Sequence, residues 1–237
     1  MNCLILAAGV GSRLRDHSHS KPLTPLSGRP LIEHVIERAI AGGATAFTIV
    51  TGHRAEPLEA YLSRLAADIG VPIRCVRITD WERPNGHSAL AGAAAIAGDF
   101  LLLMSDHLFD PIIVRRLITA GRGESALVLA VDRDVAGPLL DLDDATKVET
   151  ENGRIVRIGK TLARFDAIDT GIFLAGLELP EAIGAAICAG ADGSLSDGVQ
   201  WLADRGTATI LDVTGAGWID VDDGRMLALA ENYIAQR

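Results

Sequence analysis

Short apolar runs alternate with amphipathic stretches through the first 104 residues of the chain. The runs predict buried strands, at residues 4–6, 46–50, 73–78 and 100–104. The stretches between them place apolar residues at helical spacing and predict helices, at residues 30–42, 58–69 and 87–97. Alternating β and α units of this length predict a parallel, doubly wound sheet that binds ligands at the carboxyl ends of its strands.

The second half of the chain has a different pattern. Residues 147–151 and 154–158 flank Asn152-Gly153, which predicts a β-hairpin with a type I′ turn. Residues 165–174 predict a further strand, and residues 225–234 a final helix. We therefore predict an α/β, Rossmann-like fold, with a mixed, mostly parallel central sheet flanked by helices. The late antiparallel hairpin is expected to form a wall or lid for a second substrate.

No linker or repeat divides the chain, so we expect one domain over residues 1–237. Within it, residues 1 to about 135 are expected to bind a nucleotide. The remainder, from about residue 136 to residue 237, is expected to bind an acceptor substrate and to supply the C-terminal helix.

The segment after the first strand has the composition of a phosphate-binding loop. Gly9 and Gly11 allow backbone N–H groups to approach an anion, and the small Ala7 and Ala8 leave room for a nucleotide. Arg13 and, further on, Lys21-Pro22 add positive charge. The string lacks the third glycine of the dinucleotide fingerprint and the Gly-Lys-Ser/Thr of a P-loop. A bare Gly-x-Gly is equally typical of an ordinary strand-to-helix turn.

Composition excludes several classes of protein. The chain of 237 residues is 49% hydrophobic, with a net charge of −9 and a pI near 5.1, so it shows no basic surface for nucleic acid. Three separated cysteines indicate a reducing compartment and exclude the usual zinc motifs. The apolar runs are far shorter than the ~20 residues of a membrane-spanning helix. We expect a cytoplasmic protein that is not inserted in a membrane.

Acidic residues at two places indicate a metal site. Asp106 follows the apolar strand 100–104, and Mg²⁺ prefers carboxylates together with phosphate oxygens. Asp106 could equally be a strand-end cap. Near the C-terminus, Asp220 and Asp222 would face the same way on a strand. We expect Asp222 and Asp223 to serve as N-caps of the last helix rather than in catalysis.

Polar residues after two further strands are candidates for the nucleotide pocket. Thr51 ends the strand 46–50, and Asn85, Gly86 and Ser88 lie at the start of a helix rich in small residues, where backbone amides could meet a base or a phosphate. An ordinary Asn-Gly turn with a serine cap explains the second group equally well.

Four longer strings carry a resemblance that covers nearly the whole chain. They are Trp-Glu-Arg-Pro-Asn-Gly-His-Ser at 81–88, Met-Ser-Asp-His-Leu-Phe-Asp-Pro at 104–111, Asp-Asp-Ala-Thr-Lys-Val at 143–148 and Asp-Ala-Ile-Asp-Thr-Gly at 166–171. With the glycine loop, they resemble the CTP:inositol-1-phosphate cytidylyltransferases of the sugar-phosphate nucleotidyltransferase superfamily. The resemblance implies a nucleotidyltransferase fold, the cofactor Mg²⁺, and the substrates CTP and inositol 1-phosphate.

The resemblance also implies roles for individual residues. Arg13, Lys21 and Asp106 would be catalytic, and Asp106 and Asp220 would hold the metal. The acceptor would contact Asp144, Lys147, Lys160, Asp169, Thr170 and Gly171, with the two lysines receiving its phosphate. The nucleotide would contact Leu6, Ala7, Ala8, Gly9, Gly11, Ser12, Arg13, Lys21, Thr51, Asn85, Gly86, Ser88 and Asp106. For His107 we expect a supporting or packing role rather than that of a base.

Two alternatives and one departure from the family stay open. The acceptor could be phosphocholine or a hexose 1-phosphate, or the chain could be a non-catalytic nucleotide-binding module. Choline would call for an aromatic cage, and aromatic residues make up only 4% of the chain. Family members are often fused to a membrane alcohol phosphotransferase. Here that partner could be a separate protein, the chain could be a fragment, or the product could serve another route.

Overall fold

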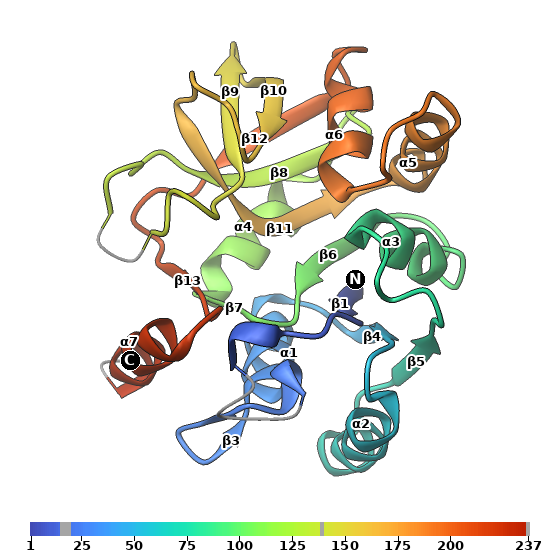
Figure 1. The fold of residues 1–237 in the computed structure, drawn as a ribbon, viewed down its shortest axis with the longest axis vertical. Helices are drawn as coiled ribbons and strands as arrows, with labels where there is room; N and C mark the ends of the chain where they lie inside the picture. Colours follow the sequence, from blue (N-terminus) through green and yellow to red (C-terminus); the bar gives the residue numbers. More distant parts are fainter. Residues whose placement is uncertain (15–19, 138–139, 236–237) are drawn as a thin grey trace.

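The computed structural model describes residues 1–14, 20–137 and 140–235, and its main feature is one twisted sheet (Figure 1). The described strands of this sheet lie in the order β5 (Ile73–Arg77), β4 (Ala46–Thr51), β1 (Asn2–Ala7), β6 (Phe100–Met104), β11 (Ala167–Ala175), β8 (Leu127–Asp132), β12 (Ala208–Asp212), β10 (Arg154–Gly159) and β9 (Lys147–Glu151). The strands β5, β4, β1 and β6 are parallel, which confirms the doubly wound first half.

Helices cover both faces of the sheet (Figure 1). This follows from strands that are apolar on both sides: in β1, Cys3 and Ile5 face one core while Leu4 and Leu6 face the other. The first core contains residues of α1 (Leu31–Gly42), α2 (Ala55–Ile69), α4 (Pro111–Ala120) and α7 (Gly224–Ala235). The second contains residues of α3 (Asn85–Ala93), α5 (Glu178–Cys188) and α6 (Leu195–Ala203).

The predicted hairpin is present and is built into the main sheet. Asn152 and Gly153 have φ of +50° and +78°, the sign that a type I′ turn requires at both central residues. Beyond the turn, β10 pairs with β12, and β9 also pairs with the start of β11. The pairings among β11, β8, β12, β10 and β9 therefore close into a ring (Figure 1).

Two short pairs lie outside the main sheet. One joins β2 (Pro25–Leu26) to β3 (Arg29–Pro30). The other joins β7 (His107–Phe109) to β13 (Trp218–Asp220), so that Asp220 lies opposite His107. The β7–β13 pair brings the C-terminal part of the chain to the carboxyl end of β6.

Predicted and observed bounds differ by a few residues at several elements. The helix predicted at 87–97 is α3, which begins at Asn85, directly after Pro84, and ends at Ala93. The helix predicted at 58–69 begins at Ala55, because Pro57 is tolerated within a first turn. Among the described helices, none combines the length and apolar character that crossing a bilayer requires.

Candidate active site

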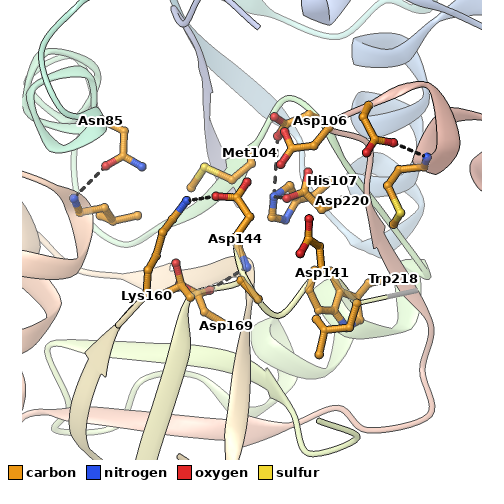
Figure 2. Close-up of a pocket in the computed structure, with 18 of the residues that line it drawn as sticks. Asn85, Met104, Asp106, His107, Asp141, Asp144, Lys160, Asp169, Trp218 and Asp220 are labelled. Atoms are coloured by element: carbon orange, nitrogen blue, oxygen red, sulfur yellow. Dashed lines mark hydrogen bonds and ion pairs between the residues drawn. The ribbon is translucent and has the colours of Figure 1, made fainter. Parts of the chain in front are cut away.

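Two adjoining cavities open at the carboxyl ends of β1 and β6. The first, the glycine-loop cavity, has a volume of about 360 Å³ and is lined by Ala7, Ala8, Gly9 and Gly11 among others. The second, the hairpin-side cavity, has a volume of about 300 Å³ and is drawn in Figure 2. Both cavities share a set of wall residues, namely Arg13, Asn85, Met104, Asp106 and Asp222.

The backbone of the glycine loop is shaped around Lys21. Gly11 has φ of +60°, and a Cβ atom there would lie 2.3 Å from Cβ of Lys21. Glycine is therefore required both by the backbone angle and by the close approach of the lysine. Leu6, Ala7, Ala8 and Gly9, which were expected to contact the nucleotide, also line this cavity. The side chain of Ser12 lies outside the described part of the structure.

Lys21 is a buried cation held between two carboxylates. It is 8% exposed, and its Nζ donates to Asp106 and to Asp222. Burial alone would lower the pKa of Lys21, but the negative charges of Asp106, Asp220 and Asp222 outweigh burial and raise it. Lys21 therefore remains protonated and fixed at the junction of the cavities.

Asp144 bridges the two sides of the site. Its carboxylate accepts from Arg13, on the glycine loop, and from Lys160 at 2.5 Å, beyond the hairpin (Figure 2). Arg13 also donates to Asp222 at 3.1 Å. Hydrogen bonds from Lys160 and then Arg13 hold the pKa of Asp144 well below its usual range. Both cations are exposed over half of their side chains, 51% for Arg13 and 57% for Lys160, so they can exchange partners.

A cluster of Asp106, His107 and Asp220 lies beside Lys21 and could hold a metal ion, since one ligand atom from each lies within 4.8 Å of the others (Figure 2). His107 Nε2 is 3.4 Å from Asp220 Oδ2 and 3.8 Å from Asp106 Oδ1. Oδ1 of Asp220 is buried and has no hydrogen-bond partner among the described residues. An unpaired buried carboxylate oxygen is costly. The unpaired Oδ1 of Asp220 is therefore suited to be a ligand of a cation.

The ionisation of this cluster reflects its mutual charges. Burial lowers the pKa of His107, but Asp220 and Asp106 outweigh burial and raise it to about 10. Burial raises the pKa of Asp220, but His107 and Lys21 outweigh burial and lower it to about 2. In the absence of a metal, an imidazolium and an ammonium group therefore balance the carboxylates.

The floor of the hairpin-side cavity comes from β11. Asp169 accepts from the N–H of Gly171 at 2.7 Å, and burial raises the pKa of this carboxyl to about 6. Gly171 has φ of +74°, and a Cβ atom there would lie 2.4 Å from His107 Nδ1. Thr170 does not line the cavity: its hydroxyl donates to Ala130 O at 2.9 Å, and its carbonyl oxygen lies 2.7 Å from His107 Nδ1.

The expected capping roles of the C-terminal aspartates are half wrong. Asp223 does cap α7, because its Oδ1 accepts from Met226 N at 2.8 Å. Asp222 instead points into the site and accepts from Lys21 and Arg13. The alternation argument that put Asp220 and Asp222 on one side was sound. The cap went to Asp223 because it is the last residue before α7 begins at Gly224.

Three other residues that were expected to contact a substrate lie outside the walls of both cavities. Thr51 is fully buried, does not line either cavity, and donates to Glu59 at 2.5 Å. Gly86 is absent from both cavity walls, and a Cβ atom there would lie 2.4 Å from Gly193 O, so its role is close packing of α3. Lys147 donates to two backbone carbonyl oxygens, of Leu142 and Lys160, and does not line the hairpin-side cavity.

Asn85 and Ser88 do line the glycine-loop cavity, where two residues outside the expected set, Trp81 and Arg83, accompany them. The Trp81 ring makes an edge contact with His53, with ring centroids 4.8 Å apart. Asn85 Oδ1 accepts from Leu195 N at 2.9 Å, which ties α3 to the start of α6. Trp81 lies in the loop between a predicted strand and a predicted helix, and a large aromatic residue in such a loop is the signal that could have identified this wall of the glycine-loop cavity.

Comparison with known proteins gives the family. Residues 3–152 match the MobA-like NTP transferase domain. The chain is 37% identical over 233 residues to a "Bifunctional IPC transferase and DIPP synthase" of Rubrobacter xylanophilus, covering 97% of this chain and 51% of the relative. It is 32% identical to a protein of the same name from Thermococcus kodakarensis, covering 98% of this chain and 50% of that one. The chain thus spans about half the length of these curated relatives.

Solved structures confirm the fold. The inositol-1-phosphate CTP transferase from T. maritima superimposes with a TM-score of 0.87 at 24% identity, covering 99% of this chain and 95% of that one. A UDP-glucose pyrophosphorylase superimposes with a TM-score of 0.81 at 20% identity, covering 100% and 99%. These findings agree with the nucleotidyltransferase assignment made from the sequence, and the chain belongs to the MobA-like NTP transferase domain family.

Proposed function

We propose that this protein transfers a cytidylyl group from CTP to inositol 1-phosphate, giving CDP-inositol and pyrophosphate in an Mg²⁺-dependent reaction. The observation that carries the proposal is the meeting of two cavities at Arg13, Asp106 and Asp222. One cavity has a phosphate-type glycine loop and the other has a cation and carboxylates. Residues up to about 135 would supply the first substrate's site, and the later residues the second's.

The glycine-loop cavity is assigned to CTP. Backbone amides of the loop, together with Arg13 and Lys21, would hold the triphosphate, while Asn85 and Ser88 on α3 would lie near the base. The choice of cytosine over other bases rests on the resemblance and on relatives' names. The T. maritima protein that superimposes on this chain is an inositol-1-phosphate CTP transferase.

The hairpin-side cavity is assigned to inositol 1-phosphate. Lys160 and Arg13 would bind the phosphate in exchange for their present partner Asp144. Asp144 and Asp169 would then accept hydrogen bonds from ring hydroxyls. Among the described residues that line this cavity, Trp218 is the only tryptophan, tyrosine or phenylalanine. A quaternary ammonium ligand is usually held by a cage of several such rings, so phosphocholine is disfavoured.

Asp106 and Asp220 would hold Mg²⁺, and the buried, unpaired Oδ1 of Asp220 supports that fit. When bound, a divalent cation neutralises phosphate charge and stabilises the leaving pyrophosphate.

The protein's own residues align two anions for an in-line displacement. A phosphate oxygen of inositol 1-phosphate attacks the α-phosphorus of CTP, and the bond from that phosphorus to the bridging oxygen of pyrophosphate breaks. The phosphate monoester is already a nucleophile, so no general base or covalent intermediate is required. Lys21, fixed at the junction of the cavities, would help to align the two substrates, and its positive charge would offset the repulsion between their phosphates.

The test is pyrophosphate release from a matrix of CTP, UTP, ATP and GTP against inositol 1-phosphate, phosphocholine and glucose 1-phosphate. CTP with inositol 1-phosphate should give the highest kcat/KM, and Asp106→Asn or excess chelator should nearly abolish turnover. A preference for glucose 1-phosphate would overturn the acceptor assignment and leave nucleotidyl transfer standing. No pyrophosphate from any pair would favour a nucleotide-binding module.

The proposed product implies a further step elsewhere. CDP-inositol is an activated phosphodiester donor, so we expect its consumer to be an alcohol phosphotransferase. The proposed location of the chain itself is the cytoplasm.

A further inference from the structure

We infer that His107 is a third protein ligand of the metal site, and that the site therefore binds a first-row transition ion such as Co²⁺ more tightly than Mg²⁺. The inference rests on the proposed function only in taking Asp106 and Asp220 as metal ligands. It goes beyond that function by adding a nitrogen donor and a metal preference.

The ring of His107 is held as metal-binding imidazoles are held. Its Nδ1 lies 2.7 Å from the carbonyl oxygen of Thr170, which can only accept, so Nδ1 carries the hydrogen. A histidine that binds metal usually donates its other ring N–H to a carbonyl or a carboxylate. With Nδ1 committed in this way, Nε2 is the atom that would bind a metal, which would replace the proton that Nε2 carries in the metal-free cluster. It faces Asp220 and Asp106 at 3.4 and 3.8 Å.

Two further contacts fix the plane of the ring. Trp218 stacks against it with centroids 5.9 Å apart and an interplanar angle of 29° (Figure 2). The indole N–H of Trp218 is itself held by Asp132 Oδ2 at 2.9 Å. On another side, Gly171 lacks the side chain that would collide with Nδ1. The imidazole is thus positioned before any ligand arrives, and its side chain is only 14% exposed.

The donor set then determines which metal is preferred. Two carboxylates with water and phosphate oxygens suit Mg²⁺, whereas an imidazole nitrogen favours first-row transition ions. The unpaired Oδ1 of Asp220 shows that the carboxylates are incompletely satisfied by Lys21 and His107. An ion coordinated by the two carboxylates and the imidazole would give that oxygen a partner. Such an ion must also bind a nitrogen ligand well.

The experiment compares Co²⁺ and Mg²⁺ binding by calorimetry on the metal-stripped protein without substrates. His107→Asn keeps an amide N–H near the position of Nδ1 and loses Nε2. It should weaken Co²⁺ binding by at least ~10-fold and change Mg²⁺ binding by less than about threefold. His107→Gln, which returns a neutral oxygen near the position of Nε2, should keep Mg²⁺ binding within about threefold of the wild type and should not restore the Co²⁺ preference. The visible absorption of bound Co²⁺ should change in both variants.

His87→Gln is the matched control, because it removes a half-buried imidazole that lines neither active-site cavity. It should leave both affinities and the Co²⁺ spectrum unchanged. Equal weakening of both metals by His107→Asn would overturn the inference, since it would show that His107 only positions Asp220. Unchanged binding in that variant, or Mg²⁺ bound as tightly as Co²⁺ by the wild-type protein, would overturn it too. None of these outcomes bears on pyrophosphate release, which tests the proposed function separately.

Discussion

Asp222 and Asp223 are adjacent carboxylates with different partners, so replacing each should affect a different property. Asp222 accepts from buried Lys21 and from Arg13, whereas Asp223 caps α7 through Met226 N. Asp222→Asn should therefore reduce catalysis, and Asp223→Ala should reduce stability.

The magnitudes follow from these contacts. A hydrogen bond between charged groups contributes about 1.5–3 kcal/mol, and the Arg13 contact is discounted because that side chain is 51% exposed. Loss of the Lys21 contact should then lower kcat/KM for CTP roughly 10- to 150-fold. Burial, and then the charge of Asp220, raise the pKa of Asp222 to about 6, so its ionised form opposes folding at neutral pH. Asp222→Asn should accordingly leave the unfolding temperature unchanged or slightly raised.

Loss of the helix cap in Asp223→Ala should cost about 0.5–2 kcal/mol. For a chain of this size, that corresponds to a fall of roughly 1–8 °C in the unfolding temperature. Asp223→Asn is the matched control, because asparagine caps a helix as well as aspartate does. Thermal unfolding by circular dichroism and pyrophosphate release at varied CTP measure the two effects. Full activity in Asp222→Asn, or a stability loss there equal to that of Asp223→Ala, would refute the assignment of Asp222 to the site.

Three other predictions follow from contacts around the hairpin and β11. Lys160→Ala should raise KM for inositol 1-phosphate about tenfold or more without changing stability, whereas Lys147→Ala should mainly lower the unfolding temperature; reversed effects would contradict their placements. Asp166 has a pKa lowered by hydrogen bonds and a nearby arginine that together outweigh burial. Its contribution to stability is present above about pH 4 and lost as pH falls through the folded-state pKa. The unfolding temperature should therefore fall more steeply below about pH 4 in the wild type than in Asp166→Asn, and parallel curves would count against this. Gly171→Ala should displace His107, cost about 1–3 kcal/mol by overpacking and reduce turnover, which thermal unfolding and pyrophosphate release would show together.

Residues that are contiguous in the sequence could be placed without the structure. The glycine loop and Asp106 each follow a strongly apolar run, and parallel strands bring their carboxyl ends to one edge of the sheet. The hairpin was equally predictable from the sequence, because Asn-Gly specifies its turn. These features depend only on local pattern and on one rule of topology.

Contacts that depend on loops and short strands could not be predicted in the same way. The strand β13 has only three residues, and its pairing with β7 decides that Asp220 faces His107. Lys147 and Lys160 lie together at the open end of the same hairpin, where Lys147 is paired with Gly159. The sequence does not indicate that Lys147 donates to the backbone carbonyl oxygens of Leu142 and Lys160. Thr51 ends β4 at the expected edge, but the arrangement of α2 turns its hydroxyl to Glu59.

Charge balance in the site would allow its cations to bind both anionic substrates of the proposed reaction. Every cation of the site is paired with a carboxylate in the described structure, which lets a protein of net charge −9 hold positive groups ready for anions. The exposed pairs of Asp144 with Arg13 and Lys160 cost little to break, because ion pairs near solvent are weak. The buried pair of Lys21 and Asp106 costs much more to break. We therefore expect substrate phosphates to displace Asp144 from the exposed cations Arg13 and Lys160. Lys21 should keep its carboxylate partners and its position throughout the reaction.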